Sequence, residues 1–132
     1  METRVVGKLS VNKRMVRDFY ETAFNLHKPR EAAEKHLGKV YRQHNPMVGD
    51  GPEAFVNFVA AYAQANPQLH IDIKRIIAEG DLVVTHSHLT LYAQDRGMAV
   101  ADIFRVENGK IVEHWDVSQA VPAEAANSNT MF

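Results

Sequence analysis

The spacing of apolar residues changes at Pro67, and this change most constrains what the chain can fold into. Before Pro67, apolar side chains recur every three or four residues, which is typical of amphipathic helices. After Pro67, short segments alternate between apolar and polar residues and are separated by turn residues, which is typical of strands. Helices followed by strands predict an α+β fold in which an antiparallel sheet carries the helices on one side.

Three helices are predicted in the first half of the chain. Pro29 ends the first helix and opens the second, since proline suits the first turn of a helix. Gly38 is expected to end the second helix as a left-handed cap. Asp50 and Glu53 have the spacing of a capping box at the start of the third. A connection is predicted at residues 40–46. The predicted helices cover residues 12–26, 30–37 and 50–65.

Four strands are predicted in the second half, joined as an antiparallel meander. Asn108-Gly109 is the strongest hairpin signal, because a type I′ turn needs a positive φ at both central residues. A strongly curved meander with helices on its concave side forms a cone with an internal pocket. Its convex face needs cover, which predicts a homodimer. The predicted strands cover residues 69–78, 82–92, 98–107 and 110–119.

The length and composition indicate one ordinary globular domain. A chain of 132 residues suits a single domain over residues 1–132. A net charge of −1 gives no general attraction to nucleic acid or anionic membranes, so neither is an expected partner. The lack of cysteine excludes disulfides and thiolate catalysis. No apolar run reaches the roughly 20 residues of a membrane span, and no signal segment is evident, so we expect a cytoplasmic protein.

The strongest candidates for catalysis are two histidines and one aspartate on neighbouring strands. His86 and His88 are two residues apart and therefore share a strand face. Asp102 lies within an apolar run of the next strand, where a carboxylate must be paired. A turn at residues 94–97 would place His88 opposite Asp102. Such a pair suits general acid–base catalysis, although a buried pair that only satisfies itself has the same pattern.

Two further segments carry residues that could shape a pocket. His44, followed by Asn45-Pro46, lies in a predicted connection that could border the pocket or serve only as a local turn. In the last strand, Trp115 is expected on the inner wall, either as a pocket residue or as core. Strict alternation then places His114 and Asp116 on the outer face.

A metal site is an alternative use of the same polar residues. Two histidines and one carboxylate form a known iron ligand set. The residues up to and including His88 match the first part of a cupin-like metal motif. The glutamate that should follow in this motif is missing, because Tyr92 and Ala93 stand in its place. We therefore expect no resident metal. The residues that could form an adventitious site are His44, His86, His88 and Asp102.

Three segments of the chain resemble the SnoaL-like branch of the NTF2-like (nuclear transport factor 2-like) superfamily. They are residues 41–46, 51–55 and 102–116, of which the last is the most diagnostic. The resemblance covers nearly the whole chain. It implies a cone-shaped α+β barrel, usually a homodimer through its sheet.

The resemblance also implies a type of chemistry. SnoaL-like enzymes are polyketide cyclases that close a ring by aldol condensation without a cofactor. They use an aspartate as acid/base and a histidine fourteen residues before it, a spacing that His88 and Asp102 match. The expected substrate is a small hydrophobic carbonyl compound. The residues expected to shape its pocket are Tyr41, His44, His86, Phe104 and Trp115.

Two functions therefore follow from the sequence. The first is an enzyme that transfers a proton next to a carbonyl group in an aldol, isomerase or dehydratase reaction. The second is a non-catalytic module that holds a hydrophobic metabolite in the same pocket or binds a protein on its sheet. Substrate turnover distinguishes the two functions. Only an enzyme turns over a substrate, and that turnover would depend on Asp102.

Overall fold

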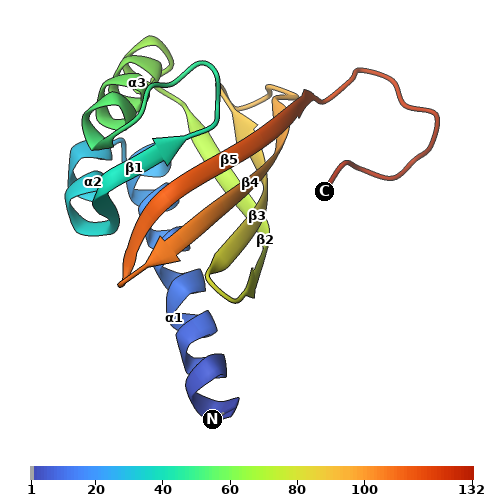
Figure 1. Ribbon diagram of the computed structural model, residues 1–132. Coiled ribbons are helices and arrows are strands. Elements are labelled where there is room, and N and C mark those ends of the chain that lie inside the picture. The colour runs from blue at the N-terminus through green and yellow to red at the C-terminus, as the bar shows by residue number, and fades with distance from the viewer. Residues whose placement is uncertain (1) are drawn as a thin grey trace.

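The computed structural model describes the backbone of residues 2–132 and the side chains from Gly7 onward. Its helices pack against one side of a curved sheet (Figure 1). The helices are α1 (Glu2–Tyr20), a short π-helix (Glu21–Asn25) that continues it, α2 (Pro29–His36) and α3 (Pro52–Ala65). The strands are β1 (Leu37–Gln43), β2 (His70–Glu79), β3 (Leu82–Thr90), β4 (Met98–Glu107) and β5 (Lys110–Ala120).

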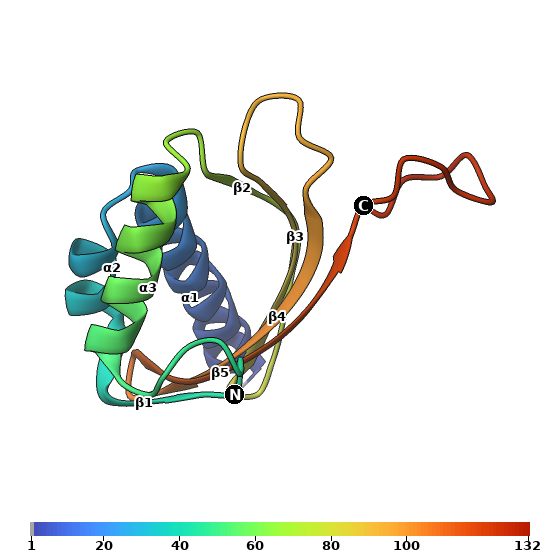
Figure 2. The same ribbon diagram turned by 90° about the horizontal axis from the view of Figure 1, so that it is seen from above.

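Across residues 2–132 the strands form one open sheet in the order β1-β5-β4-β3-β2. Strands β2 to β5 pair in antiparallel fashion, as the sequence predicts, whereas β1 runs parallel to β5. Figure 2 shows the sheet curving around the side that carries α1 and α3. The α+β cone fold is thus confirmed, but the predicted four-stranded meander is incomplete, because the sheet has a fifth strand.

The fifth strand occupies a segment that was predicted to be partly helix cap and partly connection. Gly38 does not cap α2 but lies within β1, where a Cβ atom would come within 3.1 Å of Val112 Cγ1. Glycine is therefore needed for close approach to β5 rather than for a positive φ. Because β1 pairs with a strand about seventy residues away, local sequence patterns do not reveal it.

The predicted helices are present, with differences at their ends. Helix α1 begins at Glu2, well before residue 12. The expected capping box of α3 is wrong, because Gly51 is its N-cap and makes no side-chain cap bond. The carboxylate of Asp50 instead accepts a hydrogen bond from the Gln43 backbone N–H at 2.7 Å. Along residues 2–132, none of the helices is both long and apolar enough to cross a membrane.

The core lies between the helices and the inner face of the sheet. Phe19 of α1 is fully buried and stacks on Phe55 of α3 with ring centroids 4.8 Å apart. Its other side meets the edge of Phe104 of β4 at 6.3 Å. Burying a side chain of this size contributes roughly 1.5–3 kcal/mol. These contacts fix α1 against β4. Both elements supply residues of the candidate active site.

Candidate active site

The pairing of β3 with β4 decides which histidine can reach Asp102. Asp102 lies opposite Thr85, whereas His88 lies opposite Ala99. The prediction that His88 faces Asp102 is therefore wrong. The strands are joined by a longer connection than the predicted turn at residues 94–97, and an odd shift in register moves a side chain to the other face.

His86 and His88 lie on the outer face of the sheet, near the end of the chain. The ring of Phe132 stacks on both imidazoles, with centroids 5.7 Å from His86 and 4.3 Å from His88. The Nε2 atom of His88 donates a hydrogen bond to the carbonyl of Arg96 at 2.7 Å. This face is separated from Asp102 by the sheet itself.

Asp102 is fully buried on the inner face and has two hydrogen-bond partners at one oxygen. The Tyr20 hydroxyl donates to Oδ1 at 2.6 Å, and His114 Nε2 lies 2.7 Å from the same oxygen. The Tyr20 hydroxyl is also 3.2 Å from His114 Nε2. Helix α1 and strands β4 and β5 thus meet at a single carboxylate.

The neighbours of His114 determine where its protons lie. Gln43 Oε1 accepts the backbone N–H of Asn45 at 3.1 Å, so this atom is the amide oxygen. His114 Nδ1 lies 2.7 Å from that oxygen and must therefore carry a hydrogen and donate it. A bare Nε2 facing an ionised Asp102 at 2.7 Å would set two lone pairs against each other. One proton therefore lies between Nε2 and Oδ1 and belongs to the pair.

A β-bulge in β5 brings His114 to the inner face. Val106 lies opposite Ile111, and Arg105 lies opposite Glu113, which leaves Val112 as an extra residue in β5. Such a bulge shifts the alternation of side chains by one position. Positions with odd numbers face inward before the bulge, and positions with even numbers face inward after it.

The bulge overturns the predicted orientation of the last strand. His114 is buried and Asp116 borders the cavity described below, so their predicted placement on the outer face is wrong. Trp115 lies on the outer face opposite Ile103, and its predicted place on the inner wall is also wrong. The ring of Trp115 stacks on His44 with centroids 4.8 Å apart. Strict alternation fails here because a single inserted residue leaves no periodic signal.

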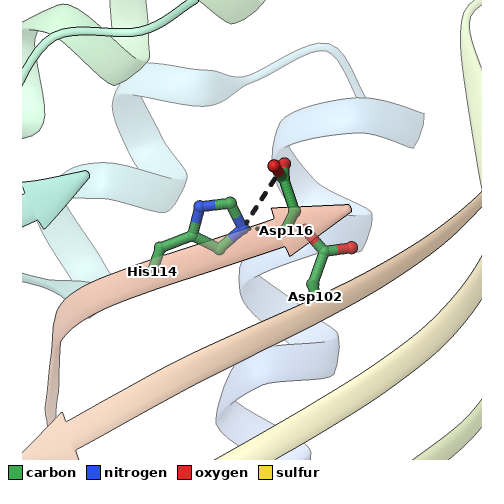
Figure 3. A group of neighbouring side chains, drawn as sticks. All are labelled: Asp102, His114 and Asp116. Carbon is green, nitrogen blue, oxygen red and sulfur yellow. Dashed lines mark hydrogen bonds and ion pairs between the residues drawn. The ribbon is translucent and has the colours of Figure 1, made fainter. Parts of the chain in front are cut away.

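The inner face holds a cavity of about 190 Å³ beside the Asp102–His114 pair. Figure 3 shows His114 and Asp116, both from β5, close to Asp102 from β4. A smaller hollow of about 40 Å³ adjoins the cavity and reaches His114. The cavity is lined by Tyr20, Phe24, Asn45, Phe58, Tyr62, Ile71, Leu89, Met98, Val100, Asp102, Asp116 and Ser118.

Burial sets the protonation of the groups that face the cavity. It raises the pKa of Asp116, an effect that nearby His114 and the hydrogen bond from Asn45 at 3.1 Å partly oppose. The pKa of the Tyr20 hydroxyl lies well above its usual value, first because of burial and then because of Asp102. Burial likewise raises the pKa of Tyr41. The tyrosines therefore stay protonated, and Asp116 holds a proton more readily than an exposed aspartate.

The second oxygen of Asp102 is left without a hydrogen bond. Among residues 7–132, no partner lies within reach of Asp102 Oδ2, nor of the hydroxyls of Thr85 and Ser87 on the same face. Thr85 lies directly across from Asp102 on β3. Oδ2 is thus the oxygen of Asp102 whose hydrogen-bonding capacity is unused.

A polar network on the outer side fixes the loop that follows β1. Glu113 accepts hydrogen bonds from His44 Nε2 at 2.7 Å and from Arg105 Nε at 2.9 Å. These bonds, His44 first, lower the pKa of Glu113. Because His44 is held outside, the next residue, Asn45, reaches the inner side and bonds Asp116. His44 thus contacts the outer network rather than the cavity.

The two remaining predicted pocket residues lie on the inner side. Tyr41 borders the smaller hollow, and its hydroxyl accepts a hydrogen bond from Gln43 Nε2 at 3.3 Å. Phe104 is fully buried beneath the site, with its centroid 5.0 Å from both Tyr20 and His114. Phe104 therefore supports the polar groups from below instead of lining the cavity.

The structure does not bring together the histidines considered for a metal, since they lie on the outer face and Asp102 on the inner one. A different set is close: one ligand atom each from Asp102, His114 and Asp116, all within 4.8 Å of one another. Two carboxylates and an imidazole could hold a divalent cation. Ligation would require His114 Nε2 to give up the proton that it shares with Asp102.

Several site residues were not identified from the sequence. The signal for Tyr20 is a phenol hydroxyl on the apolar face of the first helix, where burial requires a partner. The signal for His114 and Asp116 is their place two residues apart in a strand. Gln43 and Asn45 carry no such signal, because their roles depend on the β1–β5 pairing. The residues added by the structure are Tyr20, Gln43, Asn45, His114 and Asp116.

Comparison with known proteins identifies relatives by sequence and by fold. A family model described as SnoaL-like polyketide cyclase matches residues 14–127. TsrD from Streptomyces laurentii is 24% identical, with a TM-score of 0.68 over 81% of this chain and 87% of that one. A SnoaL-like protein of unknown function from Burkholderia thailandensis is 16% identical, with a TM-score of 0.71 over 83% and 96%. No curated protein matches the sequence.

Proposed function

The chain belongs to the SnoaL-like polyketide cyclase family, and from this premise we propose that it is a cofactor-independent acid–base catalyst. It transfers a proton at a carbon next to the carbonyl group of a small, largely apolar compound. The observation that carries the proposal is the 2.7 Å contact between His114 Nε2 and Asp102 Oδ1 beside the cavity. A buried pair of this kind can take up or release a proton without a change in its surroundings.

The proposed reaction begins when Asp102 accepts a proton from the carbon next to the carbonyl. In the reactive form His114 holds the shared proton, and the carboxylate is ionised. Oδ2 takes the substrate proton, the C–H electron pair forms the C=C bond of the enolate, and the carbonyl oxygen gains the negative charge. Tyr20 keeps Oδ1 oriented through its 2.6 Å hydrogen bond.

Asp116 is the proposed donor to the developing oxyanion. Its pKa is raised by burial, so a protonated fraction persists at higher pH than for an exposed aspartate. Its position at the cavity wall allows it to donate a hydrogen bond to the substrate oxygen, which stabilises an enolate. Return of the proton to another carbon gives isomerisation. Attack of the enolate on a second carbonyl gives an aldol product.

The catalytic histidine in this proposal differs from the one expected from the sequence. His88 has the spacing to Asp102 that the family resemblance implies, but it lies on the outer face of the sheet. His114 contacts Asp102 directly and takes that role here. The proposal therefore keeps Asp102 as the acid/base and replaces its partner.

We also propose that the outer face of the sheet pairs with a second copy of the chain. The register aligns four apolar side chains across neighbouring strands, and part of this row is exposed to solvent. Ile77 is 60% exposed and Ile103 36%. A continuous apolar row on an exposed sheet face is stabilised by burial against a partner. The row consists of Ile77, Val84, Ile103 and Trp115.

A panel of carbonyl compounds in D₂O tests the catalytic proposal. The protein is expected to exchange solvent deuterium into the position next to the carbonyl of at least one compound, as measured by NMR. Compounds that raise the melting temperature of the protein without any exchange would contradict the proposal. That result, unchanged in Asp102→Asn, would instead support a non-catalytic binding module.

A further inference from the structure

The cavity has a volume of only about 190 Å³, and its size restricts the substrate. Resting on the proposed function, we infer that the substrate is a single-ring carbonyl compound, or an open chain of similar bulk, and not a fused multi-ring polyketide. The carbonyl lies toward Asp102 and Asp116, and the hydrocarbon part lies toward α3 and the apolar side chains of β2, β3 and β4. The inference rests on the volume, the chemistry and the fixation of the cavity walls.

The volume of about 190 Å³ admits little more than one ring. For comparison, an engineered cavity of about 150 Å³ binds benzene, and pockets for drug-sized ligands start at about 300 Å³. The adjoining hollow adds about 40 Å³, which still leaves the total below that range. A fused three- or four-ring compound would have to leave most of its surface outside the cavity.

The walls divide into a polar end and an apolar end. Asp102 and Asp116 lie side by side at the polar end, where Asn45 donates a hydrogen bond to Asp116. This end suits one oxygenated edge of a substrate. The other walls offer hydrocarbon, sulfur and ring surfaces, apart from the hydroxyls of Tyr62 and Ser118. The apolar walls come from Phe24, Phe58, Ile71, Leu89, Met98 and Val100.

Walls at both ends are held in place, so that the cavity resists expansion. Asn25, at the end of the π-helix, bonds both backbone groups of Ile71: its amide donates to the carbonyl at 2.9 Å and accepts the N–H at 2.7 Å. Tyr20 is fixed by Asp102 and by its edge contact with Phe24 at 5.0 Å. Widening here would break these bonds. Phe58 of α3 also lines the cavity and is 36% exposed.

A ladder of ketones tests the inference: cyclohexenone, a two-ring decalone and a three-ring perhydrophenanthrenone. Dissociation constants are measured by calorimetry, and deuterium exchange is measured in parallel. The one-ring ketone is expected to bind at least tenfold more tightly than the three-ring ketone. Leu89→Ala enlarges the apolar end and is expected to shift this preference at least fivefold toward two rings. Leu82→Ala, on the same strand but 38% exposed, is the matched control.

The outcomes separate the size inference from the proposed function. Wild-type protein that binds the three-ring ketone as tightly as the one-ring ketone overturns the inference. Unchanged preference in Leu89→Ala does the same, with Met98→Ala as the second enlarging variant if Leu89→Ala does not fold. Binding of the one-ring ketone without deuterium exchange leaves the size inference intact and contradicts the catalytic proposal.

Discussion

Asp102 is stable in an apolar strand because Tyr20 and His114 converge on one of its oxygens. A buried carboxylate without partners would cost several kcal/mol. The sequence predicted that Asp102 needs a partner, but the predicted histidine was wrong. Residue numbers alone do not determine how two neighbouring strands are aligned. The correct partner follows from a bulge and from the length of the β3–β4 connection, neither of which has a periodic signature.

At this scale Gln43 orients His114, and its amide oxygen also accepts the backbone N–H of Asn45. Gln43→Leu removes the acceptor of the His114 Nδ1 hydrogen, so the imidazole loses its fixed orientation. We expect kcat to fall about tenfold or more while KM stays within about twofold, because Gln43 acts through His114 and not on substrate. We also expect the free energy of unfolding to fall by about 1–3 kcal/mol, from the buried unpaired N–H.

Steady-state kinetics and urea unfolding measure these two effects. The matched control is Gln119→Leu, at an exposed position of β5. Asn66→Leu would not serve as a control, because the Asn66 amide makes a hydrogen bond within the fold. An unchanged kcat in Gln43→Leu would show that the orientation of His114 does not matter for the reaction.

At the scale of elements, local patterns identified the strands and most turns. Asn108 and Gly109 have φ values of 51° and 74°, which confirms the predicted tight turn between β4 and β5. The helix predicted at residues 50–65 matches α3 closely, and the one predicted at residues 12–26 ends close to the end of the π-helix, although α1 begins earlier, at Glu2. The missed element is β1, because a parallel edge strand depends on a distant partner. Because β1 was not predicted, the roles of Gln43 and Asn45 were not predicted either.

The β3–β4 connection supplies a test of the register. Gly97 has a φ of 65°, and a Cβ atom there would lie 2.1 Å from the carbonyl oxygen of Leu89. Gly97→Ala should therefore lower the free energy of unfolding by more than about 2 kcal/mol. Gly80→Ala, with a φ of 59° and open space around it, should cost only about 1 kcal/mol.

Thermal or urea unfolding of both glycine variants provides the comparison. Because the two positions share a positive φ, the difference between them reports the close approach to β3. Equal destabilisation by the two substitutions would contradict the packing of Gly97 against Leu89.

The network around Glu113 predicts a pH dependence. The folded-state pKa of Glu113 lies below its ordinary value of 4.5, first because of the hydrogen bond from His44. Its contribution to stability is therefore complete above about pH 4.5 and is lost as the pH falls through the lowered pKa. Glu113→Gln should be less stable than wild type near pH 6, and the difference should shrink below about pH 4.5.

Urea unfolding between pH 3 and pH 7 measures the gap between the two proteins. Glu107→Gln, an exposed glutamate that also pairs with Arg105, is the control and should show a smaller gap. A gap for Glu113→Gln that stays constant down to pH 3 would show that the charge of Glu113 does not stabilise the fold.

At the scale of the whole molecule, the order of helices and strands predicted the α+β cone, in which the helices lie on one side of the curved sheet (Figure 2). The outer face bears the apolar row and the two stacked histidines. If the outer face pairs two copies, the protein has twice the chain mass of 14.9 kDa in solution. Light scattering measures this mass.

A charge placed in the apolar row tests the homodimer. Ile103→Lys puts a cation in the centre of the row and is expected to give a monomer, because a buried unpaired charge is strongly unfavourable. Met47→Lys, at a loop position that is 78% exposed, should leave the mass unchanged. A wild-type protein with the mass of one chain at high concentration would contradict the proposed pairing.

The central claim is that proton transfer occurs at the inner Asp102–His114 pair, and deuterium exchange with a one-ring ketone tests it most directly. Asp102→Asn and His114→Gln are expected to lower the exchange rate at least about 100-fold, while both proteins still unfold cooperatively. His88→Ala and Asp81→Asn, at an outer-face histidine and an exposed carboxylate, should keep nearly the full rate. Loss of exchange in His88→Ala with retention in His114→Gln would contradict the account.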